Sequence, residues 1–376
     1  MSLNEFVPAD AEERAIYEKV AAFIDAAPTG EEAFEALALA LFAFQFARNR
    51  GYRDFARQRG ATPRMVRSFR DIPAVPINAF KTLELSCTPP ERSERVFMTS
   101  GTTRGGIRGR IHHATLDIYD RSMRAGFAHF FMRGLQRLPM AILFPDETAM
   151  PNSSLAHYLA LAMRDFGTPD SRNVMGPDGI DLPALLAMLR RAEASGEPFA
   201  LLGASYAFVH LLDRLDAEGL RFSLPPGSRL FDTGGFKGQS REVAPEEFYD
   251  KLSAVFGVPR ALCINMYGMT ELSSQFYDDG NASVPSVKRA MPWLRSRVVD
   301  PLTGRDVPDG TTGVLVHHDL AHVNVVSAIL TEDLGIAREG GVALLGRVSG
   351  AEAKGCSLAL DAFLAAARPR DVAAAS

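Results

Sequence analysis

The middle of this chain alternates strand-like runs with amphipathic helical runs, and this alternation limits the fold more than any other feature. Three pairs follow one another: "LPMAILFPD" with "SSLAHYLALAMRDF", "PFALLGAS" with "YAFVHLLDRLDAEG", and "SRLFDTGG" with "PEEFYDKLSAVFG". Strands that are joined through helices pair in parallel, and the helices then cover both faces of the sheet. We therefore predict an α/β fold with a mostly parallel sheet flanked by helices.

Different patterns lie on either side of this central part. From Pro8 to Gly60 the apolar residues recur at helical spacing, which predicts a helical lead-in. Toward the other end, turn residues separate short apolar runs, which predicts a β-rich subdomain with "DPLTGRDVPDGTTG" as the long turn of a hairpin. We expect the lead-in over 1–62, an α/β core over 63–285, the β-rich subdomain over 286–358 and a short tail over 359–376.

Composition and charge exclude several classes of protein. With 47% hydrophobic and 23% charged residues, the chain has the composition of an ordinary globular protein. A net charge of -4 argues against generic nucleic-acid binding. The apolar runs are interrupted or shorter than the about 20 residues that a membrane span requires, and the N-terminus lacks a basic start followed by an apolar stretch. We expect a cytoplasmic protein with no membrane span.

The cysteines do not indicate a structural framework. Cys87, Cys263 and Cys356 are an odd number at wide, irregular spacing, which indicates neither a disulfide network nor a CxxC metal site. Cys263 lies in the apolar run "ALCINMY", and we expect it in the core. A functional cysteine in this chain would act as a free thiol.

The histidines do not indicate a metal site either. His112 and His113 follow an arginine-rich segment, and we expect a solvated pair. The stretch "HHDLAH" contains His317, His318 and His322, but it follows a predicted strand whose alternation would send the first two to opposite faces. The sequence therefore predicts no structural metal.

One loop combines an unusual number of hydrogen-bond donors. In "RVFMTSGTTRGGIRGR", Arg95 to Arg110, hydroxyl side chains and glycines follow a short apolar run and lie among arginines. Glycines let the backbone turn and expose its N–H groups, hydroxyls add donors, and arginine adds charge-assisted bonds to anionic oxygens. The stretch is neither a Walker A sequence nor a GxGxxG turn. It suits a polyphosphate, although a solvated, turn-rich loop is the alternative for this stretch taken alone.

Four more stretches follow this loop in order: "DTGGFKG" (Asp232 to Gly238), "NMYGMTE" (Asn265 to Glu271), "LTEDLG" (Leu330 to Gly335) and "LLGRVSGAEAKGCS" (Leu344 to Ser357). The whole series resembles the adenylate-forming enzymes. In that superfamily a Ser/Thr/Gly loop holds the β- and γ-phosphates of ATP, a Tyr-Gly-x-Thr-Glu motif lies beside the α-phosphate and adenine, and a later aspartate binds the ribose hydroxyls. The resemblance therefore implies an ATP- and acyl-binding core of the adenylate-forming fold.

The resemblance also implies roles for individual residues. Thr270 would contact the α-phosphate, Glu271 would bind Mg²⁺, and Asp333 would accept from the ribose hydroxyls with Arg347 close by. The other residues expected to bind the nucleotide are Thr99, Ser100, Gly101, Thr102, Thr103, Arg104, Gly234, Gly235, Tyr267 and Gly268.

The chain departs from the superfamily pattern at three places. Glu332 replaces the glycine of the usual Thr/Ser-Gly-Asp, in what we expect to be a turn. Arg104 replaces the usual glycine after the threonines, and the lysine just beyond is missing, so that Arg104 or Arg108 would supply its charge. The chain also ends soon after Gly346 and Arg347, the hinge position of larger relatives, so we expect their small C-terminal domain to be absent.

Within the superfamily, the chain looks like the LuxE-type acyl-protein synthetases, which activate long-chain fatty acids and carry the acyl group on a cysteine near the C-terminus. "AKGCSL" places Cys356 at the matching position, and "TGGFKG" and "FKT" are similar to the family's pattern. This resemblance implies ATP-dependent formation of acyl-AMP, release of pyrophosphate, transfer to Cys356 as a thioester, and delivery to a reductase partner. Lys237 and Lys81 are the candidates to replace the catalytic lysine of the larger relatives.

The chemistry of these residue types fits such a reaction. A carboxylate must first displace pyrophosphate from ATP, and because that step concentrates negative charge on phosphate, its catalysis is mainly electrostatic and positional. A thiolate then attacks the acyl-adenylate readily.

Besides a nucleotide-binding partner that no longer catalyses, two alternative enzymes stay open. The first is an adenylate-forming ligase that passes the acyl group to coenzyme A or a carrier protein, with no catalytic role for Cys356. The second is a serine hydrolase, since Ser205 follows a strand-like run and precedes a helix. Ala207 stands where a nucleophile elbow has its second glycine, and we expect Ser205 to cap the helix instead.

Overall fold

The computed structural model of the chain describes residues 2–3, 5–99, 108–236, 238–348, 357–361 and 364–365. These residues form two compact units, and each unit combines segments that are distant in the sequence. Unit 1 comprises Met1–Tyr119, Pro292–Ala337 and Leu345–Ser376, whereas unit 2 comprises Asp120–Met291 and Arg338–Leu344. The four domain ranges that we expect from the sequence, 1–62, 63–285, 286–358 and 359–376, stay predictions.

Three helices open unit 1 and confirm the predicted helical lead-in: α1 (Ala11–Ala26), α2 (Glu31–Arg48) and α3 (Arg50–Gln58). The side chain of Asp10 caps α1 by accepting from the backbone N–H of Glu13, and Asn49 caps α3 by accepting from that of Tyr52. Such caps satisfy backbone donors that the first turn of a helix leaves without a partner. Each helix buries an apolar face within the unit.

The main sheet of unit 1 is antiparallel and contains β13 (Leu294–Val299), β14 (Thr312–Asp319) and β15 (Ala328–Arg338). The short strand β1 (Val75–Pro76) pairs with β15 in parallel. Because β13 and β14 pair along all six residues of β13, the hairpin predicted around "DPLTGRDVPDGTTG" is confirmed. The amide of Gln45 in α2 donates to the carbonyl oxygens of His322 and Val323, which attaches the lead-in to the segment between β14 and β15.

A separate hairpin in unit 1 carries the ends of the donor-rich loop. It consists of β2 (Arg95–Met98) and β3 (Arg110–His113), which pair antiparallel. Short 3₁₀ helices precede it: η1 (Phe69–Asp71), η2 (Ile77–Lys81) and η3 (Pro90–Arg92). The buried ring of Phe97 fixes the hairpin to the interior of the unit.

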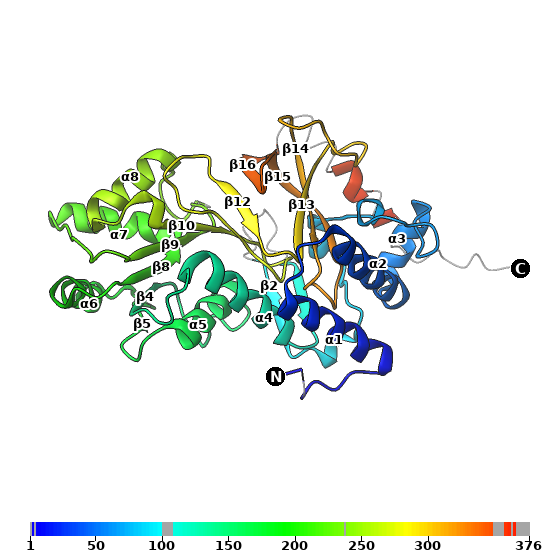
Figure 1. Cartoon of the computed structure of the whole chain (residues 1–376), viewed down its shortest axis with the longest axis horizontal. Helices are drawn as coiled ribbons and strands as arrows, with labels where there is room; N and C mark the ends of the chain where they lie inside the picture. The colour runs from blue at the N-terminus through cyan, green and yellow to red at the C-terminus, as the bar shows by residue number, and fades with distance from the viewer. Residues whose placement is uncertain are drawn as a thin grey trace, which may run out of the picture. The chain divides into compact units, whose positions relative to one another are not determined.

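The sheet of unit 2 has a parallel centre, as the strand–helix alternation predicts (Figure 1). Its parallel strands lie in the order β5 (Arg172–Asn173), β4 (Met140–Leu143), β8 (Ala200–Ala204), β9 (Arg229–Thr233) and β10 (Cys263–Tyr267). Beyond β10 the pairing is antiparallel through β11 (Phe276–Tyr277), β12 (Val287–Ala290) and β16 (Gly341–Arg347). A small hairpin of β6 (Met175–Gly176) and β7 (Gly179–Ile180) lies apart from this sheet.

Helices cover both faces of this parallel centre, and adjacent residues of β9 show how. Leu230 belongs to a buried apolar cluster with α6 (Leu182–Ser195), α7 (Ser205–Ala217) and α8 (Pro245–Phe256). Phe231 points to the opposite face, where its ring stacks on Tyr158 of α5 (Ser154–Phe166) at 5.7 Å. On the same side lie α4 (Asp117–Gly126) and the π-helix η4 (Phe127–Met132), whose Phe127 also contacts Phe231. These layers confirm the predicted α/β class with helices on both faces.

The described helices also bear on the prediction about membranes. None of the helices in the described ranges combines the length and the apolar character that crossing a bilayer requires.

Candidate active site

The two motifs expected to bind the nucleotide in unit 2 begin side by side. Strands β9 and β10 are direct neighbours, and their paired residues end with Thr233 opposite Met266. The "TGG" stretch continues from β9, and "YGMTE" begins at the last residue of β10, so Gly234 and Tyr267 lie at adjacent strand ends. Open α/β sheets bind their ligands outside the carboxyl ends of parallel strands, which is where these motifs lie.

The glycines at these strand ends leave the backbone accessible. Gly234 has φ +75°, a left-handed conformation that favours glycine. A Cβ added at Gly234 or Gly235 would meet no atom of the described residues within 4 Å, so those residues leave space beside this turn. At Gly268 a Cβ would come within 2.9 Å of the sulfur of Met266. The described residues therefore leave room for a ligand at the first turn, whereas a side chain at Gly268 would have to displace the flexible side chain of Met266.

Glu271 and Thr270 lie just beyond β10, close to the start of a helix. Glu271 is only 6% exposed. The hydroxyl of Thr270 lies 3.5 Å from that of Ser154 in the first turn of α5. The N-terminus of a helix carries partial positive charge, so this neighbourhood favours anions.

A buried histidine holds the N-terminal half of α5. His157 lies one turn after Ser154, and its Nδ1 lies 2.6 Å from Glu147 Oε1, while its Nε2 lies 2.8 Å from Asp120 Oδ1. Both ring nitrogens can donate only when the imidazole is protonated. Burial alone lowers the pKa of His157, but the bonds and charges of Asp120 and Glu147 outweigh it and raise the pKa above 6.5. His157 therefore links the loop after β4 to α4 as a cation.

This linkage predicts a pH-dependent stability. A histidine whose pKa is raised by folding stabilises the folded state fully below its unfolded pKa, and this stabilisation is lost as pH rises through the folded pKa. We expect His157→Gln to lower the free energy of unfolding by about 2 kcal/mol at pH 6 and by less at pH 9. Urea unfolding at both pH values measures this, with the exposed His210 replaced in the same way as the control. An equal loss at both pH values would contradict the charged state of His157.

In unit 1, the donor-rich loop is closed at its base by two hydrogen bonds. The backbone N–H of Thr99 donates to the carbonyl oxygen of Gly109 at 3.0 Å, and the N–H of Gly109 donates to the hydroxyl of Thr99 at 2.9 Å. The hydroxyl of Thr99 keeps its own proton to donate. Five of the residues expected to bind phosphate lie outside the described residues: Ser100, Gly101, Thr102, Thr103 and Arg104.

A short polar series lies beneath this loop base. A Cβ at Gly109 would lie 3.2 Å from the carbonyl oxygen of Phe80, so helix η2 packs directly against the base. In the same helix, Lys81 Nζ donates to Asn78 Oδ1 at 2.8 Å, and Asn78 donates to the carboxylate of Glu332. Lys237, the other lysine considered, lies outside the described residues.

The residue expected to bind ribose lies in a strand, not in a turn. Thr331, Glu332 and Asp333 belong to β15, so the turn expected here is wrong. An extended backbone suits any residue, which explains how Glu332 can replace glycine. The backbone N–H of Asp333 donates to the hydroxyl of Thr331 at 3.1 Å, and Arg347 Nε lies 3.6 Å from Asp333 Oδ1.

The two described cysteines are poorly suited to nucleophilic attack. Burial raises the pKa of both the Cys87 and the Cys263 thiols well above the usual range, so little thiolate forms at neutral pH. Cys263 is 1% exposed, which confirms the expected core position. The proposed acyl carrier, Cys356, lies outside the described residues.

The histidines expected to be solvated are buried, so that prediction is wrong. His112 bonds to Glu84 Oε1 at 2.8 Å and to the hydroxyl of Ser93 at 3.0 Å. His113 packs against the ring of Phe97 at 5.0 Å. Alternation along β3 could not reveal this, because the side chains of this strand lie in the protein interior on both faces.

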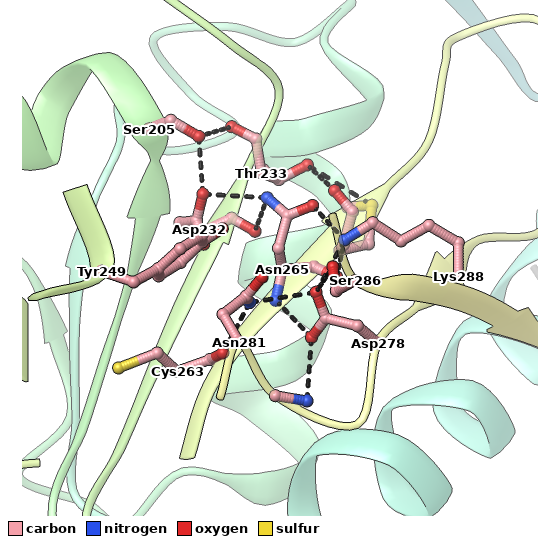
Figure 2. Close-up of polar contacts among 12 residues, drawn as sticks. Ser205, Asp232, Thr233, Tyr249, Cys263, Asn265, Asp278, Asn281, Ser286 and Lys288 are labelled. Carbon is pink, nitrogen blue, oxygen red and sulfur yellow. Dashed lines mark hydrogen bonds and ion pairs between the residues drawn. The ribbon is translucent and has the colours of Figure 1, made fainter. Parts of the chain in front are cut away.

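Ser205 is neither a helix cap nor an activated nucleophile. It is the first residue of α7, and the cap position belongs to Ala204, which makes no side-chain bond. Its hydroxyl donates to Asp232 Oδ2 at 2.7 Å and lies 3.1 Å from the carbonyl oxygen of Thr233 (Figure 2). No histidine contacts this hydroxyl among the described residues, so the structure offers it no general base of the Ser–His kind.

The polar residues that connect the two strand ends form no motif that local sequence could reveal. Asp232, Asn265 and Lys288 form a buried network directly before the "TGG" and "YGMTE" motifs. The sequence offered one signal: Asp232 lies two residues before Gly234, and Asn265 lies two residues before Tyr267. Their pairing depends on the register of β9 against β10, which no local pattern encodes.

Two known ligases are similar in sequence to most of this chain. The chain is 26% identical over 335 residues to a long-chain-fatty-acid–luciferin-component ligase of Vibrio harveyi, covering 85% of each chain. It is 24% identical over 306 residues to a ligase of the same name from Aliivibrio fischeri, covering 79% of this chain and 77% of the relative.

Solved structures share the fold at low sequence identity. The structure of a 2-hydroxyisobutyryl-CoA ligase with 2-HIB-AMP matches with a TM-score of 0.59 and 15% identity, covering 93% of this chain and 73% of that chain. The chain spans about half (49%) of the ATP-bound MatB from Rhodopseudomonas palustris, with a TM-score of 0.48 and 19% identity. The family model described as "Acyl-protein synthetase, LuxE" matches residues 23–365. The chain therefore belongs to the LuxE acyl-protein synthetase family.

Proposed function

We propose that this protein activates a long-chain fatty acid with ATP and transfers the acyl group to a cysteine thiol. The fatty-acid carboxylate attacks the α-phosphorus of ATP, which forms acyl-AMP and releases pyrophosphate. A thiolate then attacks the acyl carbon, which forms a thioester and releases AMP. The observation that supports the proposal is the pairing of β9 with β10, because the two stretches that we expect to bind the nucleotide follow these adjacent strands in a member of the LuxE family.

The nucleotide would lie against the strand ends of unit 2. The open turn at Gly234 and Gly235 allows a planar base to approach the backbone closely. Tyr267 and Gly268 follow on the neighbouring strand, and Thr270 beside the first turn of α5 would donate to the α-phosphate. Attack at phosphorus concentrates negative charge there, so a donor at this position stabilises the transition state more than the ground state.

Glu271 would hold a magnesium ion. Mg²⁺ at phosphate-transfer sites is commonly bound by one or two carboxylates together with substrate phosphates and water. A single carboxylate at the edge where the phosphates are proposed to lie fits that donor set. When bound, the ion would neutralise charge on the phosphate oxygens.

In unit 1, Thr99 to Arg104 would hold the terminal phosphates, Asp333 would accept from the ribose hydroxyls, and Arg347 would limit the mobility of that carboxylate. We propose that Lys81 adds a positive charge at the base of the loop, in addition to the charges of Arg104 and Arg108. Its helix packs against the base of the loop, and Asn78 fixes its ammonium group at 2.8 Å.

The thiol of the second step would be that of Cys356. Both described cysteines have thiols with raised pKa values, which leaves Cys356 as the candidate for attack. A thioester keeps the acyl carbon reactive, so the group can pass to a partner that reduces it. The names of the Vibrio and Aliivibrio relatives support a long-chain fatty acid as the substrate.

One experiment separates this function from its nearest alternative. The protein is incubated with MgATP and radiolabelled myristic acid, and pyrophosphate exchange and denaturing gels are measured in parallel. We expect acid-dependent exchange and a hydroxylamine-sensitive label on the chain. Exchange without any label would favour transfer to coenzyme A or a carrier protein, and no exchange would exclude adenylate formation altogether.

A further inference from the structure

Asp232 is the centre of a buried polar network between the two nucleotide motifs (Figure 2). Its Oδ2 accepts from the hydroxyl of Ser205 at 2.7 Å and from the amide of Asn265 at 2.9 Å. Its Oδ1 accepts from the hydroxyl of Tyr249 at 3.0 Å. The carboxylate thus receives donors from the start of α7, from α8 and from β10.

The network extends from Asn265 to a buried ion pair. Lys288 Nζ donates to Asn265 Oδ1 at 2.5 Å and to Asp278 Oδ2 at 2.7 Å. Asp278 also accepts from Asn281 and Ser286, at 3.0 and 2.8 Å. The lysine fixes which way the Asn265 amide points, because its oxygen faces Lys288 and its nitrogen must then face Asp232.

Backbone contacts connect this network to the motifs themselves. The Asn265 amide also lies 3.3 Å from the carbonyl oxygen of Asp232, and the hydroxyl of Thr233 donates to the carbonyl oxygen of Met266 at 2.9 Å. The hydroxyl of Ser205 lies 3.3 Å from the carbonyl oxygen of Gly234. The residues immediately before the "GG" turn and before Tyr267 are therefore held together by side chains as well as by the strand ladder.

The buried charges do not balance. Asp232, Asp278 and Lys288 are all less than 5% exposed, and with both carboxylates ionised they carry one excess negative charge. Burial raises the pKa of Asp232 to about 6, although the bonds from Ser205 and Asn265 and the charge of Lys288 lower it. At neutral pH the carboxylate of Asp232 is thus ionised, although its buried surroundings favour the neutral form. A neutral side chain would suit folding better.

We infer that Asp232 is a positioning residue for nucleotide binding: its carboxylate sets the spacing between the Gly234–Gly235 turn and Tyr267 by anchoring Ser205, Tyr249 and Asn265. The inference rests on the proposed function, because it assigns these two turns to the nucleotide. A carboxylate can accept all three donors at once. The neutral acid cannot, since one oxygen becomes a donor and the Asn265 amide, held by Lys288, cannot turn to accept it.

The groups facing Asp232 from each neighbouring element determine its titration. Tyr249 faces it from α8, Lys288 from β12, Asp278 from the segment after β11, and Cys263 from β10. Burial raises the pKa of Tyr249 well above its usual value and also raises that of Cys263, so both stay neutral between pH 5 and 8. The titration of Asp232 is therefore not obscured by Tyr249 or Cys263 in that range.

The test compares MgATP binding by calorimetry between pH 5 and 7.5 for the full chain and for Asp232→Asn. The terminal phosphate of ATP also titrates near pH 6, so the readout is the ratio of the two Kd values at each pH. We expect the variant to bind roughly tenfold more weakly at pH 7.5 and equally at pH 5, where the native carboxyl is also neutral. The melting temperature of the variant at pH 7.5 should be equal to or above that of the native protein.

Two further variants keep the inference falsifiable. Ser205→Ala removes a donor that lowers the pKa of Asp232, so the loss of ATP affinity on acidification should begin at a higher pH. Asp278→Asn is the matched control, because it leaves Lys288 buried without its partner and should lower the melting temperature. A Kd ratio near one at all pH values, or an Asp232→Asn variant that loses affinity only as it loses stability, would overturn the inference. Absence of MgATP binding by the native protein would instead overturn the proposed function.

Discussion

Replacing Cys356 with serine is expected to abolish the acyl label on the chain while pyrophosphate exchange continues at the native rate. The two steps use different groups, since adenylate formation needs the phosphate-binding residues and the second step needs a thiolate. A serine hydroxyl is far less ionised than a thiol at neutral pH and attacks the acyl carbon correspondingly slowly. We expect the label to fall at least 100-fold, with acyl-AMP accumulating in its place.

The matched control is Cys87→Ser. Of the two described cysteines, Cys87 is the one outside the core of unit 2, and its raised pKa makes it a poor nucleophile. This variant should keep both the label and the exchange. If the label persists in Cys356→Ser and disappears in Cys87→Ser, the assignment of the acyl carrier is wrong.

Replacing Glu271 with glutamine is expected to abolish the first step. The side chains have nearly the same shape, so the change removes the negative charge with little effect on packing. We expect pyrophosphate exchange to fall by roughly 100- to 1000-fold, the range found when one group that stabilises a charged transition state is removed. Measuring pyrophosphate exchange against magnesium concentration separates a metal-binding role of Glu271 from a structural one. Losing a residue that binds the metal should raise the magnesium concentration needed for the half-maximal rate.

Glu247→Gln on the exposed first turn of α8 is the control for this prediction. It removes the same charge at an exposed position outside the residues expected to bind the nucleotide or the metal, and it should leave the rate unchanged. A Glu271→Gln variant with a normal magnesium requirement and a lowered melting temperature would instead indicate a structural role for this buried carboxylate.

The candidate site divides into residues that local sequence could identify and residues that it could not. The hydroxyls and glycines of the loop from Thr99, the Tyr267 motif and Asp333 stand out as motifs because their residue types and spacing are unusual within one segment. Asp232 and Asn265 do not stand out, since an acid or amide near a strand end is common. Their importance comes from one hydrogen bond between them, which joins residues 33 positions apart.

The wrong predictions have the same origin. His112 and His113 follow an arginine-rich segment, but their strand lies where the interior of unit 1 covers both faces. Glu332 was expected to disturb a turn, but β15 continues through this position. Ser205 begins a helix after a strand, as a nucleophile elbow does, yet its partner is a carboxylate from the next strand of the sheet. In each case the deciding neighbour came from a distant segment.

The sequence by itself determined the order of helices and strands, the parallel centre of the sheet and the family, because periodicity and short motifs act within a few neighbouring residues. Only the tertiary structure decided which side chains are buried together, which way the Asn265 amide points and where Asp232 titrates. Burial, desolvation and hydrogen-bond partners depend on strand register and packing between segments that lie far apart along the chain.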